Sequence, residues 1–161
     1  MNIKDILRWL TTGKVLTSHE KISRAAKKGH ESAQCALGLC YYNGDGVHQD
    51  RTEAIRWLRR AARQGNSHAQ FHLGHAHIAG KGVLKDREYA YAWFKQASSQ
   101  GHKKSAEWLP VIRQDMTSEE IAEGDWLVQE INPEPESLMK QNESPKMLVV
   151  IAGVTSIFRT T

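Results

Sequence analysis

The chain has 161 residues, of which 40% are hydrophobic and 25% are charged, and its formal net charge is +4. These proportions are ordinary for a soluble globular protein, and the length is enough for one domain or one short repeat array with a buried core. The positive charge is mild, whereas nucleic-acid-binding domains usually concentrate basic residues on one face of a matching fold. We therefore expect no nucleic-acid partner.

The two ends of the chain predict neither an export signal nor a membrane span. Residues 1–10 are amphipathic and lack the uninterrupted apolar stretch of a secretory signal. Residues 147–158 form a longer apolar run, but a membrane-spanning helix needs about 20 apolar residues. We therefore expect no membrane span and favour a chain without membrane contact, while association of the tail 147–161 with a membrane stays an alternative.

The two cysteines, Cys35 and Cys40, stand five residues apart in a predicted helix. Because a helix turns by about 100° per residue, their side chains diverge by roughly 140° and are poorly placed for a disulfide. Small half-buried thiols of this kind are typical of a reducing compartment. The sequence therefore predicts a cytoplasmic protein.

The first predicted element is a helix over residues 18–28, with Ser18 as its N-cap. Its apolar positions are Ile22, Ala25 and Ala26. Small apolar residues on one side of a short helix are typical of packing against a neighbouring helix pair. We expect residues 2–28 to form an incomplete unit that precedes the two repeats described next.

Residues 26–61 and 62–97 are two copies of one 36-residue unit, with fourteen identical positions. A period of this length indicates a solenoid, in which each repeat is one supersecondary unit. Four identical pairs have the clearest structural roles, two in apolar helix positions and two in loops: Leu37 with Leu73, Trp57 with Trp93, Gly44 with Gly80, and Gly46 with Gly82. Stacked repeats build extended concave surfaces for partners and seldom enclose a reactive pocket.

Each copy is predicted to be a helix, a glycine loop and a second helix. In the first copy, Ala33, Leu37 and Tyr41 recur at helical spacing and define an apolar stripe. Gly44 opens the loop, because glycine tolerates the left-handed conformation that ends many helices. Asp50 then stands where an N-cap residue belongs. The second copy follows the same plan.

Residues 102–131 are predicted to cap the array. They begin as a third first helix, but Pro110 replaces the repeat glycine and no glycine loop follows. Residues 117–120 read Thr-Ser-Glu-Glu, the signature of a capping box, and predict a last helix to about Ile131. The predicted helical domain is therefore 1–131, followed by a polar linker at 132–146 and a hydrophobic tail at 147–161 for which the sequence predicts no structure.

The two copies share the pattern A-x2-G-x3-AQ-x2-LG-x5-G-x-GV-x2-D-x3-A-x2-W-x3-A. This pattern resembles the Sel-one-like repeat (SLR), a relative of the tetratricopeptide repeat. The resemblance implies an all-α fold, a right-handed solenoid of antiparallel helix hairpins whose first helices line the concave face. It also implies an adaptor or scaffold that binds a protein or peptide. In bacteria, similar small repeat proteins serve as immunity partners of secreted toxins, notably type VI effectors.

The candidate partner-binding residues are the first-helix positions at which the two copies differ. They are Ser32, Ala36 and Leu39 in the first copy, and His68, His72 and His75 in the second. The three histidines fall within roughly 60° of one another on a helix. A histidine stripe on the binding face would make partner binding sensitive to pH between about 5 and 8.

A metal-binding or enzymatic role of the same histidines is the alternative hypothesis. Imidazoles four residues apart on a helix can share a zinc or nickel ion. However, no acidic or cysteine ligand is close to them in sequence, and surface histidines are common. His77 replaces Tyr41 of the first copy and is predicted to be a core residue. We therefore expect no metal and no cofactor.

Catalytic motifs give little support to an enzyme. Residues 18–21 and 137–140 match S-x-x-K, but the partner motifs S-D-N and K-T-G are absent. The glycine pairs follow helices and not strands, so they are turn formers and not phosphate-binding loops. The sequence favours a non-enzymatic protein–protein interaction module.

A basic stripe is predicted on the second helix of the first copy. Its four members recur at helical spacing: Arg56, Arg59, Arg60 and Arg63. Such a stripe either meets an acidic partner surface or is the solvated outer face of a helix, which is the commoner case.

Overall fold

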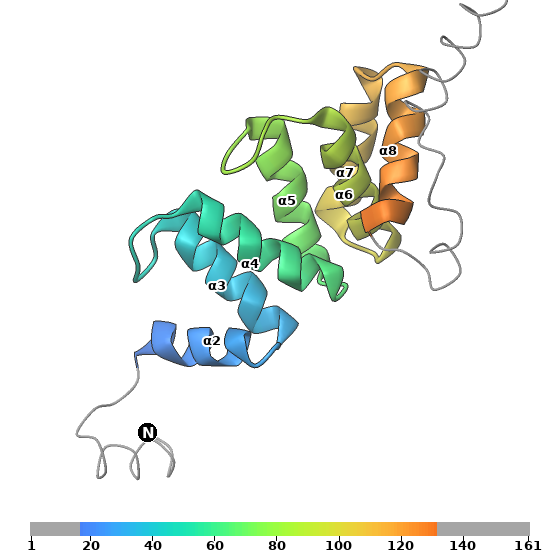
Figure 1. The fold of residues 1–161 in the computed structure, drawn as a ribbon. Coiled ribbons are helices and arrows are strands. Elements are labelled where there is room, and N and C mark those ends of the chain that lie inside the picture. The colour runs from blue at the N-terminus through green and yellow to red at the C-terminus, as the bar shows by residue number, and fades with distance from the viewer. Residues whose placement is uncertain (1–16, 132–161) are drawn as a thin grey trace, which may run out of the picture. The chain divides into compact units, whose positions relative to one another are not determined.

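The computed structural model describes residues 17–131 (Figure 1). The first part of the predicted unit 2–28, the linker 132–146 and the tail 147–161 lie outside the described residues. Within the described range the chain consists of helices and turns, without a strand. The chain divides into two compact units, residues 1–69 and 70–161, which are described separately.

The first unit contains α2 (Ser18–Lys27), α3 (Glu31–Asn43) and α4 (Arg51–Arg63). Helices α3 and α4 lie side by side as an antiparallel hairpin, and α2 packs against α3 (Figure 1). Ala26 of α2, Leu37 of α3 and Trp57 of α4 form its buried apolar cluster. The predicted helix–loop–helix plan of the first repeat is therefore confirmed.

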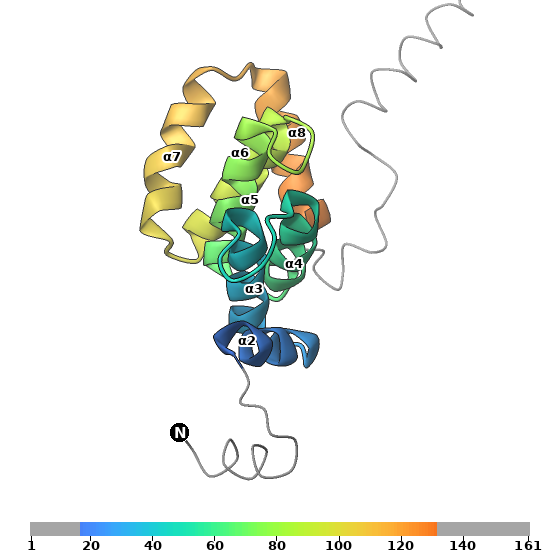
Figure 2. The same ribbon diagram turned by 90° about the vertical axis from the view of Figure 1, so that its left-hand side faces the viewer.

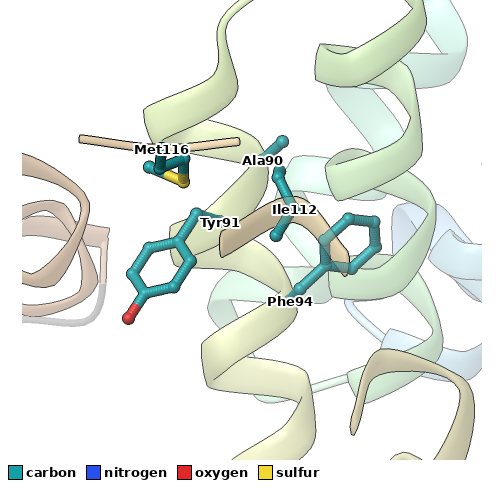
Figure 3. Packing of buried hydrophobic residues seen from close by; sticks show 5 residues of the cluster. All are labelled: Ala90, Tyr91, Phe94, Ile112 and Met116. Carbon is teal, nitrogen blue, oxygen red and sulfur yellow. The ribbon is translucent and has the colours of Figure 1, made fainter. Parts of the chain in front are cut away.

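The second unit contains most of α5 (Ser67–Ala79), together with α6 (Arg87–Ser99), α7 (Lys103–Gln114) and α8 (Ser118–Ile131). Helix α6 contacts both α7 and α8, which lie on either side of it (Figure 2). The buried cluster of this unit combines side chains of α6 with side chains of α7 and of the turn after it. Its members are Ala90, Tyr91, Phe94, Ile112 and Met116 (Figure 3).

The leucine shared by the two first helices is a core residue in both copies. Leu37 of α3 and Leu73 of α5 are each almost completely buried. Complete burial of a leucine side chain contributes about 1.5–3 kcal/mol to stability, which accounts for the same residue at both positions. Leu37 and Leu73 therefore both lie in the core.

The four glycines shared by the repeat loops adopt the backbone conformation that favours glycine. Their φ values lie in the left-handed region, at +85° for Gly44, +72° for Gly46, +63° for Gly80 and +80° for Gly82. A residue with a Cβ atom is strained there, whereas glycine is not. All four glycines therefore occupy loop positions that favour glycine over other residues.

The aspartates that follow these loops cap the second helix of each copy. The Asp50 carboxylate accepts a hydrogen bond from the Glu53 N–H at 2.9 Å, and Asp86 accepts one from the Tyr89 N–H at 3.0 Å. These bonds satisfy amides that the first turn of a helix leaves without partners. Both aspartates are therefore N-caps, as the sequence predicts.

The predicted N-cap of α2 is wrong by one residue, because Thr17 and not Ser18 caps this helix. The Thr17 hydroxyl accepts from the Glu20 N–H at 3.2 Å, and the Glu20 carboxylate accepts from the Thr17 N–H at 2.8 Å. This reciprocal pair needs a glutamate three residues after the cap, and only Thr17 has one, since Lys21 follows Ser18 at that distance. The predicted capping box at Thr117 is confirmed by equivalent hydrogen bonds with Glu120 at 3.2 and 2.7 Å.

The paired helices approach closely at a glycine of each first helix. A Cβ atom on Gly38 would lie 2.8 Å from the Leu58 Cγ, and one on Gly74 would lie 2.7 Å from the Phe94 ring. Both distances are shorter than carbon atoms tolerate, so only glycine permits this spacing. Leu58 and Phe94 consequently fill the space beside the glycines and are completely buried.

Replacing Trp57 or Trp93 by alanine should reduce the free energy of unfolding by about 3–5 kcal/mol, because each ring is almost wholly buried, at 7% and 4% exposed. Denaturant unfolding measures the change. The matched control is Leu84→Ala, which removes an apolar side chain that is 89% exposed and should cost less than about 0.5 kcal/mol. Near-neutral effects at both tryptophans would contradict the packing of the hairpins.

Gly74→Ala should cost about 1–3 kcal/mol, because the added methyl group meets the Phe94 ring. Removal of the ring by Phe94→Ala should relieve that clash, so Gly74→Ala should cost less in the Phe94→Ala background than in the natural chain. A double-mutant cycle measured by thermal unfolding tests this coupling. Strictly additive effects would show that the glycine does not set the helix spacing.

Candidate functional site

The structure distributes the six predicted partner-binding residues over both units. Ser32 and His68 are exposed, and the other four, Ala36, Leu39, His72 and His75, are half-buried. The first three positions lie on α3, in the first unit. On α5, His68 belongs to the first unit and the other two histidines belong to the second.

His75 lies among aromatic rings of three helices. Its ring centroid is 4.6 Å from that of Phe71 on α5, 5.3 Å from that of Phe94 on α6 and 4.6 Å from that of Trp108 on α7. The ring planes meet at 81°, 80° and 81°, so each contact is edge to face, an arrangement that aromatic rings prefer. We call these four residues the His75 cluster.

Two further histidines flank the cluster through Phe71. The ring centroids of Phe71 and His72 are 5.5 Å apart, and those of Phe71 and His102 are 4.8 Å apart. His102 is fixed by a second role, since its Nδ1 accepts a hydrogen bond from the Ser105 N–H at 3.2 Å and so caps α7. Helix α7 therefore contacts the His75 cluster at two places, through His102 at its N-terminus and through Trp108 near its middle.

The cluster reaches the surface through Trp108. This ring is 38% exposed, and Val111, one turn further along the same face of α7, is 57% exposed. Exposed apolar side chains that adjoin one another mark interaction surfaces more often than scattered ones do. We call the surface formed by His72, His75, Trp108 and Val111 the α5–α7 face.

Trp108 and Val111 are candidate residues that the sequence analysis missed. The signal was available: one repeat period of 36 residues places Trp108 in the position of His72, and Val111 in the position of His75. This correspondence was overlooked because Pro110 stands where the repeat has glycine, so the repeat pattern ends there. The helix nevertheless continues through Pro110 to Gln114.

The histidine stripe does not form a metal site in the part of the chain that the structure describes. No group of three or more His, Cys, Asp or Glu side chains there could hold a metal ion. His75 faces aromatic rings instead of other ligands. His77 is buried and stacks on Tyr89, with ring centroids 5.2 Å apart, as expected for a core residue. The hypothesis of a metal-dependent enzyme therefore has no set of ligands in residues 17–131.

The cysteines are also poor nucleophiles. Burial, with a smaller contribution from the nearby Glu31 carboxylate, raises the pKa of the Cys35 thiol to about 11. Burial and then the Asp45 carboxylate raise the pKa of Cys40 as well. Reactive cysteines need a lowered pKa, because the thiolate is the nucleophile. Both thiols consequently stay protonated at neutral pH.

Burial lowers the pKa of His75 below its ordinary value of 6.5, because the aromatic surroundings disfavour the imidazolium. The unfolded chain therefore binds a proton at His75 more readily than the folded protein does. Stability conferred by the neutral ring is complete above pH 6.5 and is lost as the pH falls toward the lowered pKa.

His75→Leu, which installs the residue of the first repeat, should therefore weaken the pH dependence of stability. Between pH 7.5 and pH 5.5 the melting temperature of the variant should fall less than that of the natural chain, because one proton-linked equilibrium has been removed. Thermal unfolding at the two pH values measures this. An equal fall in both proteins would contradict a buried neutral imidazole.

None of the described helices is both long enough and apolar enough to cross a membrane. The Sel1 repeat family matches residues 31–66 and 67–102, which have the same 36-residue period as the two copies and begin five residues later. No curated protein sequence matches the chain.

Two solved structures are similar to this chain. A protective antigen present in uropathogenic Escherichia coli strains, which displays an SLR fold, is 29% identical with a TM-score of 0.68; the match covers 85% of this chain but only 31% of the antigen. A Sel1 repeat protein from Oxalobacter formigenes is 39% identical with a TM-score of 0.55, over 58% of this chain and 71% of that protein. The chain therefore belongs to the Sel1 repeat family of all-α solenoids, whose repeats generally mediate protein–protein interactions.

Proposed function

We propose that this chain is a non-enzymatic adaptor that binds a protein or peptide partner on its α5–α7 face. The observation that carries the proposal is the half-exposed Trp108, held in place by its edge-to-face contact with His75. Tryptophan is enriched among the residues that dominate binding energy, because one ring buries a large area at little cost in conformational entropy.

The α5–α7 face is not required by the repeat. At the two equivalent positions the first copy has Ala36 and Leu39, the second has His72 and His75, and the third first helix has Trp108 and Val111. The shared core positions, such as Leu37 and Leu73, keep their residues between copies, whereas this pair changes each time. Repeat proteins obtain different binding surfaces in this way, because exposed residues vary while the helical scaffold stays the same.

The chemistry of the face favours an apolar side chain of the partner. Helix α5 contains no Lys, Arg, Asp or Glu, and α7 contributes an exposed indole and an exposed valine, each preceded by one charged residue a turn earlier, Lys104 and Glu107. A partner residue that inserts beside Trp108 would be shielded from water together with His75. Protonation of His75 would oppose that burial, so binding should weaken as the pH falls below neutrality.

A narrower form of the proposal makes the chain the cytoplasmic immunity partner of a secreted bacterial toxin. It rests on the resemblance to small bacterial repeat proteins, and the two free cysteines fit a reducing compartment. It requires the bound protein to be a toxin. A general adaptor would bind a partner without that activity.

The test is capture of partners by the immobilised full chain, followed by titration of the partner so identified. Trp108→Ala should weaken binding by about tenfold or more, and Val111→Ser should weaken it with little effect on the fold, since that side chain is more than half exposed. The control is Leu84→Ala, an exposed apolar residue on the loop before α6. Unchanged affinity in both face variants, with normal melting temperatures, would overturn the proposal.

A further inference from the structure

A second surface, independent of the α5–α7 face, lies in the first unit on α4. Arg59 and Arg63 are exposed, and within residues 17–131 neither forms a hydrogen bond or an ion pair. Arg56 is 71% exposed and has only a long contact of 3.4 Å to Glu53 on its own helix. Three guanidinium groups on this helix are therefore available to a partner.

Arg60 completes the row in a fixed position. Its guanidinium carbon lies 4.6 Å from the centroid of the Trp57 ring. Stacking on an aromatic face orients the planar group while it leaves the N–H donors at its edge free to bind. Trp57 itself is 7% exposed and belongs to the buried cluster, so the ring that supports Arg60 is rigid.

Two lysines at the C-terminal end of α2 extend this row, because Gln34 of α3 bridges the C-terminal ends of α2 and α4. The Gln34 side chain donates a hydrogen bond to the Ala26 carbonyl at 3.2 Å and accepts one from the Gln64 amide at 2.7 Å. Ala26 precedes two exposed lysines, and Gln64 directly follows Arg63. We call the resulting set the basic surface: Lys27, Lys28, Arg56, Arg59, Arg60 and Arg63.

The fold does not need these cations. In the second copy the positions of the four arginines hold Ala92, Lys95, Gln96 and Ser99. The single cation among them, Lys95, is paired with Asp125 of α8 at 2.8 Å. Basic residues in the last turn of a helix interact favourably with the helix dipole. This interaction explains why arginine is suitable at positions 60 and 63, but it does not explain Arg56 and Arg59. Like charges three and four residues apart repel one another and weaken a helix.

The charge of the chain is also uneven along its length. Residues 17–69 contain nine Lys and Arg against five Asp and Glu, whereas residues 70–131 contain seven against nine. The mild net charge of the whole chain therefore conceals a distinctly basic stretch in the first unit. Such a surface raises the rate at which an oppositely charged partner associates, and it disfavours partners of like charge.

We propose that the basic surface binds an acidic segment of a partner protein, through carboxylates that pair with the row of arginines on α4. Arginine suits this role because its planar group can donate two parallel hydrogen bonds to one carboxylate. The seven steps from Arg56 to Arg63 extend over about 10 Å of helix, enough for several carboxylates. A nucleic acid is the less favoured partner, because the described part of this surface presents no exposed aromatic side chain on which bases stack.

The experiment uses the full chain and fluorescein-labelled octaglutamate, with octaglutamine as the uncharged probe. Fluorescence anisotropy at low salt should show binding of octaglutamate only, weakening as salt is added. The double variant Arg59→Gln/Arg63→Gln should weaken binding by about tenfold. The matched control, Lys103→Gln/Lys104→Gln on α7, removes two exposed positive charges elsewhere and should change affinity by less than about twofold.

Melting temperatures separate lost binding from lost folding. The arginine double variant should melt at the natural temperature or above it, because repulsion along α4 is relieved. A second variant, Lys27→Gln/Lys28→Gln, should weaken octaglutamate binding as well, since it changes a different helix of the same surface. Equal losses in the α7 control would overturn the proposal, because they would show a response to net charge alone.

A nucleic-acid arm completes the test. If a 15-nucleotide oligothymidine binds more tightly than octaglutamate, and the arginine double variant abolishes that binding, the acidic-protein proposal is overturned. Weaker binding of the oligothymidine supports it. The outcome is independent of the α5–α7 face, because none of these substitutions changes a residue of that face.

Discussion

The spacing between paired helices is the constraint on which the rest of this fold depends. In each repeat a glycine of the first helix lies directly against a large apolar side chain of the second, Gly38 against Leu58 and Gly74 against Phe94. With no Cβ atom in the way, the hairpin closes tightly and the larger side chain is wholly buried. The same device recurs in α8, where a Cβ atom on Gly124 would meet the Tyr91 ring of α6.

In this fold, the residues that hold the helices together are largely distinct from the residues that could bind a partner. The glycines that set helix spacing and loop conformation are shared by both copies, and the shared leucines and tryptophans are buried within the hairpins. Some residues that differ between the copies are also buried, such as Leu58 and Phe94, but others reach the surface, such as the half-buried His75 on α5 and the exposed Arg59 on α4. A change at such a position alters what the surface offers to a partner while the hairpin beneath it remains the same. The basic surface and the α5–α7 face are both variations of this kind.

The sequence predicted most of the frame because its signals are local and repeated. The 36-residue period predicted the helix pairs, the glycines predicted the loops, and Asp50 and Asp86 predicted the N-caps. The loop and N-cap signals depend on contacts between residues that are close in sequence. The N-cap of α2 was misplaced because two hydroxyl residues stand side by side, and only the reciprocal bond with Glu20 distinguishes them. Pro110 ends the repeat pattern but not the helix, because a helix can continue through a proline at the loss of one hydrogen bond.

The aromatic surroundings of His75 were beyond sequence reasoning for a different reason. They depend on rings from α6 and α7 that lie 19 and 33 residues away in the chain, and on distances that only the packed hairpins define. A helical wheel of α5 shows that the histidines share a side but not what they face. The wheel therefore left a shared metal ion open as an alternative, whereas the packed structure shows the His75 imidazole among aromatic rings.

The hydrogen bonds of Gln34 have a consequence for how the first unit loses its structure. This buried amide side chain joins the last turn of α2 to the residue that ends α4, with both of its functional groups engaged. If either helix end frayed alone, a buried polar group would be left without its partner, which is costly. The two helix ends should therefore open together and not one at a time. The ten-residue helix α2 thereby becomes part of one cooperative element with α3 and α4.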